Sequence, residues 1–103
     1  MTVLFLLLGC AVGENHFWKE RADIYCDKLK KCDGEGFDDR YDGKGDCKDA
    51  WLKDNDATRT SYEDCEYDGG AANECLHGFR NQSCEERGEG GIPDGCNEVY
   101  DSL

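Results

Sequence analysis

Cysteine is the residue type with the most evident chemistry in this chain. There are eight cysteines in 103 residues, and none of them forms a Cys-x-x-Cys pair. Zinc sites and thiol oxidoreductases both favour such pairs, and the only histidines are His16 and His77. The spacing therefore predicts disulfide bonds formed in an oxidising compartment, and we expect no metal and no other cofactor.

Cys10 differs from the other cysteines because it follows a short apolar run, Leu7-Leu8-Gly9. This pattern resembles the lipobox of bacterial lipoproteins. The resemblance implies that Cys10 becomes the first residue of the mature protein and that its thiol carries a diacylglycerol. Because Ala11 rather than an acidic residue follows, it also implies sorting to the outer membrane. The prediction is a signal segment over residues 1–9 and a lipid tether over residues 10–14.

The segment before Cys10 is short both for a transmembrane helix and for an export signal. Its run from Val3 to Leu8 is far below the roughly 20 residues that cross a bilayer, and an export signal has a basic start and about 7 to 15 apolar residues. We interpret it as a signal whose basic start lies upstream of Met1. The alternative is an ordinary secretory signal cleaved after Gly13. That cleavage would give a secreted, soluble, cysteine-rich protein that binds a ligand or, weakly, calcium.

Lipidation of Cys10 leaves an odd number of cysteines for disulfide bonds. Three bridges then leave one thiol that is free, bonds a second molecule, or marks a lost partner. Cys26 and Cys32 cannot pair within one helix, since six helical residues rise about 9 Å and bridged Cα atoms lie within about 7 Å. Cys65 and Cys75 are expected to pair across a Gly69-Gly70 turn between antiparallel helices. The candidate disulfide residues are Cys26, Cys32, Cys47, Cys65, Cys75, Cys84 and Cys96.

Apolar residues recur at helical spacing in several segments, and no strand shows convincing alternation. The expected helices are residues 15–32, capped by Asn15, then 46–53, 58–67 and 71–80, with a last helical turn from Pro93 that carries Cys96. The expected breaks are 33–36, 42–46 and an acidic loop at 85–91. The prediction is therefore a mostly α fold: one small disulfide-stapled helical domain over residues 15–103, with Gly/Asp-rich loops.

The charge of the chain limits its partners. Asp and Glu number 24 against 12 Lys and Arg, which gives a net charge of −12. Nucleic acid is an unfavourable partner because its binding requires a basic face, and anionic lipid would repel the protein, so the lipid anchor must supply the membrane attachment. We interpret most of the acidic surface as solvated, the alternative being a recognition face for cations or basic proteins.

Two other kinds of site fit the sequence poorly. Asp38 to Asp49 can be aligned with a calcium loop, but Arg40 and Lys44 occupy unsuitable positions and Asp49 is short for the closing ligand, so a solvated turn is the preferred interpretation. No Gly-x-Ser-x-Gly elbow is present, and His77 is expected to be a surface helix residue. We expect no catalytic residues.

The cysteines also stand in distinctive local sequences. These are Tyr25-Cys26-Asp27-Lys28, Lys31-Cys32-Asp33, Asp64-Cys65-Glu66-Tyr67-Asp68, Glu74-Cys75-Leu76, Ser83-Cys84-Glu85 and Pro93-Asp94-Gly95-Cys96. Together with the segment ending at Cys10, they make nearly the whole chain resemble uncharacterised small cysteine-rich lipoproteins of bacterial envelopes. The resemblance implies a location and an architecture, and no activity. The expected function is a non-enzymatic binding or structural module whose partner, a protein or another ligand, is unknown.

Overall fold

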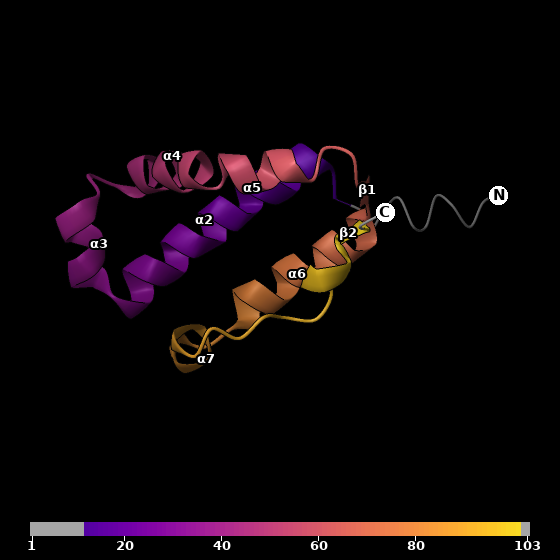
Figure 1. Ribbon diagram of the computed structural model, residues 1–103. Coiled ribbons are helices and arrows are strands. Elements are labelled where there is room, and N and C mark those ends of the chain that lie inside the picture. The colour runs from indigo at the N-terminus through magenta and orange to yellow at the C-terminus, as the bar shows by residue number, and fades with distance from the viewer. Residues whose placement is uncertain (1–11, 102–103) are drawn as a thin grey trace. The chain divides into compact units, whose positions relative to one another are not determined.

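The computed structural model describes residues 12–101 (Figure 1). The chain divides into two units, which we call the terminal unit, up to Phe17 and from Asp64 onward, and the central unit, Trp18–Glu63. The residues predicted as one domain, 15–103, contain parts of both. The prediction of a mostly α, disulfide-stapled fold is confirmed, because residues 12–101 form six α-helices, one short 3₁₀ helix and two strands of two residues each.

The first helix, α2 (Glu14–Cys32), agrees with the predicted helix to within one residue. Ala22, Cys26 and Leu29 are buried at helical spacing, which explains why the pattern was visible in the sequence. Asn15, expected as the cap, lies inside the first turn instead. Acidic Glu14 at the start and basic side chains in the last turn both favour the helix dipole.

The predicted break after Cys32 is confirmed, because α2 ends there, but it is confined to Asp33 and does not extend over residues 33–36. Helix α3 (Gly34–Arg40) begins at the next residue, and the Asp33 carboxylate accepts a hydrogen bond from the backbone N–H of Gly36 at 3.2 Å. Asp33 therefore acts as an N-cap, which offsets the low helix propensity of the two glycines. The helix places Phe37 in a buried cluster with Cys26, Leu29 and Cys47, against which Tyr25 and Tyr41 pack.

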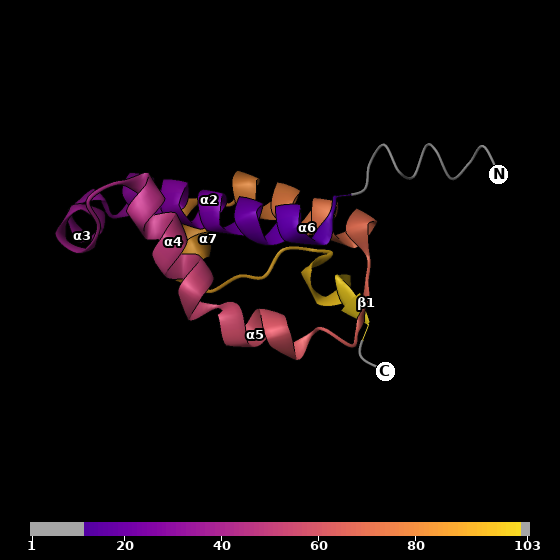
Figure 2. The ribbon, with the colours of Figure 1, turned by 90° about the horizontal axis from the view of Figure 1, so that it is seen from above.

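Two helices complete the central unit. They are α4 (Lys44–Asp54) and α5 (Asp56–Ser61), and the chain changes direction where they meet at Asn55 (Figure 2). Both the backbone N–H and the side-chain amide of Asn55 donate to the carbonyl of Trp51, at 3.0 and 2.8 Å. The predicted helix over residues 46–53 lies within α4. The one predicted over 58–67 was wrong beyond Ser61.

In the terminal unit, the chain forms β1 (Glu66–Tyr67), which pairs antiparallel with β2 (Tyr100–Asp101). Helix α6 (Gly69–Asn81) follows, and the Asp68 carboxylate caps it by accepting from Ala71 N–H at 3.0 Å. Gly69 and Gly70 therefore begin a helix rather than separate two helices. Residues Phe17, Ala72, Cys75, Leu76 and Val99 are buried in this unit.

A further short helix was missed in the predicted loop at 85–91. Helix α7 (Cys84–Gly88) begins with a capping box, in which Ser83 Oγ accepts from Glu86 N–H and Glu86 Oε1 accepts from Ser83 N–H. The 3₁₀ helix η1 (Cys96–Glu98) corresponds to the predicted last helical turn. No helix within residues 12–101 has the length and hydrophobicity that a membrane-spanning segment requires.

Candidate functional site

The disulfide bonds lie within these elements. Cys26 of α2 bonds Cys47 of α4, with Cα atoms 6.0 Å apart, and Cys75 of α6 bonds Cys96 of η1, with Cα atoms 4.6 Å apart. Cys32 and Cys84 are also disulfide-bonded. The exclusion of a Cys26–Cys32 pair is thus confirmed, since Cys26 has another partner.

The predicted pair between Cys65 and Cys75 was wrong. Cys65 has a free thiol and is half-buried, whereas Cys75 bonds Cys96. The physical reason is that Cys65 precedes a strand and not a helix, so the antiparallel helix pair that was expected to join it to Cys75 does not form. Gly95, with φ of 89°, makes the turn that brings Cys96 to α6, and only glycine adopts such a backbone conformation easily.

Cys10 and the predicted signal segment, residues 1–9, lie outside the described residues, but part of the predicted tether is described. Val12 N–H donates to the Gly69 carbonyl at 3.3 Å, and its own carbonyl accepts from the Tyr67 hydroxyl at 2.6 Å. The Tyr100 hydroxyl donates to Glu14 Oε2 at 2.7 Å. The backbone at Val12 is therefore bonded to the terminal unit two residues after Cys10.

Burial raises the pKa of Tyr67, the tyrosine that donates to the Val12 carbonyl. The ring of Tyr67 lies 6.2 Å from that of Phe17 and 5.5 Å from that of Tyr100, measured between centroids. Burial, together with the nearby carboxylates of Glu14 and Asp68, raises the pKa of Tyr67 to about 12. The hydroxyl therefore stays protonated and available as a donor at neutral pH.

An ion-pair cluster lies next to the disulfide in the central unit. Lys44 Nζ lies 2.8 Å from Asp23 Oδ1 and 2.9 Å from Asp27 Oδ1, and Lys48 Nζ lies 3.5 Å from Asp23 Oδ1. The hydrogen bond from Lys44 lowers the pKa of Asp23, and its bonds to both aspartates raise the pKa of Lys44. These charges join α4 to α2, as the Cys26–Cys47 bond does, so their role is structural.

In the central unit, the guanidinium group of Arg21 lies against an aromatic cluster. The Trp18 and Trp51 rings lie 6.0 Å apart, and the Arg21 guanidinium carbon lies 5.9 and 5.3 Å from their respective centroids. Desolvation lowers the pKa of Arg21, while the interaction with Tyr62 acts in the opposite direction. Cation–π contacts of this kind favour a desolvated arginine, and they account for its position without a ligand.

The other sequence candidates are dispersed. Asp38 lies in α3, whereas Asp46 and Asp49 lie in α4, so the segment is not the continuous loop that a calcium site requires. His77 is exposed on α6, as predicted, and His16 is exposed on α2. Among residues 12–101 no three His, Cys, Asp or Glu side chains are arranged to hold a metal ion.

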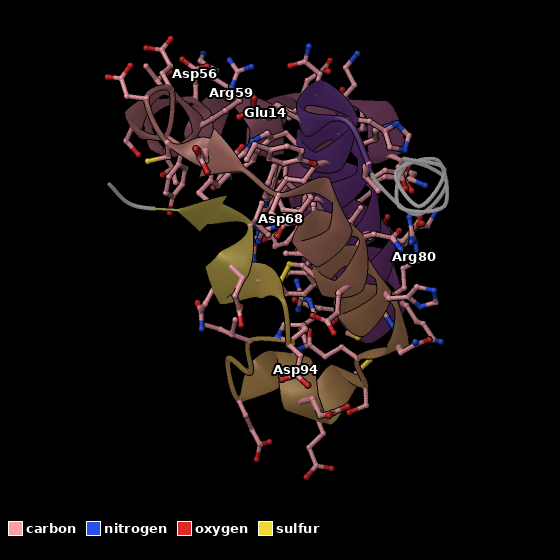
Figure 3. All side chains as sticks on the ribbon, turned by 90° about the vertical axis from the view of Figure 1, so that its right-hand side faces the viewer. Glu14, Asp56, Arg59, Asp68, Arg80 and Asp94 are labelled. Carbon is pink, nitrogen blue, oxygen red and sulfur yellow. A yellow bond between two sulfur atoms is a disulfide. The ribbon has the colours of Figure 1, made fainter. Side chains whose placement is uncertain are left out.

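The most evident concave site is a cavity of about 620 Å³ in the terminal unit. Its lining includes the carboxylates of Glu74, Glu86, Glu89 and Asp94, and no Lys, Arg or His side chain. Figure 3 shows Asp94 next to α7. The same view shows that Asp56 and Arg59 lie beside each other on α5, with Arg59 Nη2 2.5 Å from Asp56 Oδ1, so that pair belongs to the central unit and not to this cavity.

The cavity exists because the chain after α7 returns along α6 (Figures 1 and 2). Gln82 Nε2 donates to the Gly91 carbonyl at 2.8 Å, and Pro93 packs so closely on Gly78 that a Cβ there would lie 2.2 Å from Pro93 Cβ. Where the returning chain reaches η1, the Cys75–Cys96 bond fixes it to α6. We call this segment, residues 89–95, the return strap. Sequence reasoning missed the cavity because its lining combines one face of α6 with residues of α7 and the return strap, which no local pattern brings together.

Comparisons of the chain with protein-family models, with curated proteins and with solved structures find no match. The function proposed below therefore depends on the chain's own residues.

Proposed function

We propose that this chain is an exported, disulfide-stabilised binding module that acts without catalysis and is held at the outer membrane by a lipid on Cys10. The observation that carries the proposal is the disulfide framework. Six cysteines of the described chain are disulfide-bonded, and Cys65 alone among its cysteines is free. Such a framework is typical of small domains that fold in an oxidising compartment outside the cytoplasm.

A lipid on Cys10 is compatible with the way the terminal unit is built. Cys10 precedes Val12 by two residues, and two residues of extended chain span at most about 7 Å. Since Val12 is hydrogen-bonded to Gly69 and Tyr67, the anchor would hold the terminal unit close to the membrane surface. The lipid, rather than any apolar face of the protein, would supply the attachment.

The distribution of perturbed groups supports binding rather than catalysis. Active sites tend to concentrate shifted pKa values in a cleft. Arg21, Asp23, Lys44 and Tyr67 have shifted pKa values, none of these four lines the cavity, and each shift has a structural cause. The cavity instead offers carboxylates and amides, which recognise ligands by charge and hydrogen bonding.

Mass spectrometry of the mature protein from its native host tests the anchor. We expect an N-terminal Cys10 that carries acyl chains, and we expect the Cys10→Ser variant to leave the membrane fraction. An unmodified N-terminus at Glu14 would instead identify the secreted, soluble alternative. Alkylation without reduction should label Cys65 alone among the cysteines after Cys10, and labelling of two or more would contradict the disulfide framework.

A further inference from the structure

The N-terminal residues of the described chain are bonded to β1, to β2 and to the start of α6. Both polar groups of the Val12 backbone are used, because its N–H donates to the Gly69 carbonyl at 3.3 Å and its carbonyl accepts from the Tyr67 hydroxyl at 2.6 Å. Two residues later, the Glu14 carboxylate accepts from the Tyr100 hydroxyl at 2.7 Å. We call these three hydrogen bonds the N-terminal latch.

The latch depends on β2, and a disulfide bond holds the chain close to β2. Tyr67 of β1 and Tyr100 of β2 are paired, and the centroids of their rings lie 5.5 Å apart. Val99, directly before β2, is buried at 2% exposure. Cys96, three residues before Val99, is bonded to Cys75 of α6. Loss of this bond would therefore let the strand and its tyrosine move away from the N-terminal residues.

A closed latch withholds the backbone groups by which an enzyme recognises a peptide. An extended peptide is recognised largely through hydrogen bonds to its main-chain N–H and C=O groups. In the closed terminal unit both groups of Val12 are already bonded, and the Gly13 carbonyl accepts from Phe17 N–H at 2.8 Å at the start of α2. Cys10 lies at most about 7 Å along the chain from Val12. An enzyme that acts at Cys10 would therefore meet the closed unit within the segment that it must bind.

We propose that the N-terminal latch, kept shut by the Cys75–Cys96 bond, shields the processing site, so that Cys10 is acylated while the latch is open. The inference rests on the lipid attachment proposed above and adds an order of events to it. Acylation joins the Cys10 sulfur to a glycerol carbon of a phospholipid, breaks the bond between that carbon and the phosphate oxygen, and transfers the thiol proton to the phosphate. The sulfur must therefore reach the bilayer surface, where the closed terminal unit would obstruct it.

Limited proteolysis of the oxidised, full-length protein tests the latch without any lipid. Thermolysin cleaves before large apolar residues, and mass spectrometry measures how fast a product that begins at Val12 appears. Because cleavage follows the population of the open form, Tyr67→Phe should accelerate it about fivefold, which corresponds to the loss of one hydrogen bond. The control Tyr41→Phe, half-buried in the central unit, should leave the rate unchanged. Equal rates in Tyr67→Phe and the unmodified protein would overturn the latch.

Two disulfide variants test what keeps the latch shut. Cys75→Ala with Cys96→Ala should accelerate cleavage at Val12 by more than about fivefold, because the bond that holds the chain close to β2 is lost. The matched control is Cys26→Ala with Cys47→Ala, whose bond has the same sequence separation of 21 residues but lies in the central unit. It should accelerate the cleavage less than about twofold, since local openings of different regions are separate events. Equal acceleration in both variants would refute the link, because general loosening of the chain would then explain the cleavage.

An acylation assay tests the order of events. The unmodified precursor and the precursor with Cys75→Ala and Cys96→Ala are folded under oxidising conditions and incubated with membrane vesicles from the native host, and mass spectrometry follows the lipid on Cys10. We expect acylation of the variant to be about tenfold faster, as its open form is more populated, and equal rates would overturn the proposed order. If neither precursor is acylated, the lipid anchor itself is wrong and the order falls with it, while the proteolysis rates still decide whether the latch exists.

Discussion

Removal of the Cys26–Cys47 bond gives a quantitative test of the fold. The bond closes a loop with a sequence separation of 21 residues, for which the chain-entropy relation gives a stabilisation of about 3 kcal/mol. Both cysteines are fully buried, at 0% exposure, so replacing them by alanine also removes two packed sulfur atoms. We therefore expect the variant with both Cys26→Ala and Cys47→Ala to lose at least about 3 kcal/mol.

The second bond supplies a matched control. Cys75 and Cys96 are also separated by 21 residues, so the loop entropy is the same for both bonds. Cys96, however, is only half-buried. The Cys75→Ala, Cys96→Ala variant should therefore be destabilised by about 1 kcal/mol less, the difference being the cost of the additional cavity.

Urea unfolding measures how far removal of the Cys26–Cys47 bond destabilises the central unit. Trp18 and Trp51 both lie there, so tryptophan fluorescence reports on that unit, while circular dichroism reports on all the helices. With a slope of about 1 to 3 kcal/mol per molar urea, the fluorescence midpoint should fall by about 1 to 3 M. An unchanged midpoint in the Cys26→Ala, Cys47→Ala variant would refute the reasoning.

Three further predictions concern single side chains. Tyr67→Phe should remove a tyrosinate titration step at about pH 12; since burial raises the folded pKa of Tyr67 to about 12, the contribution of Tyr67 to stability is present below pH about 10 and is lost as the pH rises through 12. Lys44→Met should cost less than about 1 kcal/mol in urea unfolding, because its ion pairs are partly exposed. Gly78→Ala should destabilise the terminal unit by about 1 to 3 kcal/mol in thermal unfolding, because its Cβ would overlap Pro93.

Each of these predictions has a control. The effect of Lys44→Met should vanish in strong acid, since the pKa of Asp23 is lowered and the stabilisation is lost once the pH falls through it. Gly88→Ala meets nothing within 4 Å, so it should be neutral or slightly stabilising, and an equal loss in both glycine variants would contradict the close packing at Gly78. If the titration curve near pH 12 is the same in Tyr67→Phe as in the unmodified protein, Tyr67 is not buried as described.

The elements that could be predicted are those specified by local periodicity. The 19-residue helix α2 and the 13-residue helix α6 bury side chains at regular helical spacing, and both were found within a few residues. Helix α3 was missed because its two glycines disfavour a helix locally, whereas the Asp33 cap and the burial of Phe37 outweigh that preference.

The parts that could not be predicted depend on distant residues. Tyr67 lies in a strand because Tyr100 pairs with it, and no local pattern signals that partner. The same holds for the Cys75–Cys96 bond and for the cavity, which the return strap forms against α6. The assignment of Cys10 to a lipid allowed an odd thiol to be expected, but only the fold identifies it as Cys65.

The division of the chain has a consequence for the order of assembly. The central unit is continuous, so all of its residues, including both cysteines of the Cys26–Cys47 bond, have been synthesised once Glu63 is added. The terminal unit is discontinuous: Val12 and Glu14 must wait for Tyr67 and Tyr100, and β1 has no partner until Tyr100 and Asp101 arrive. On a ribosome or during translocation, Glu14 therefore gains its contact with Tyr100 only when nearly all of the described chain is present.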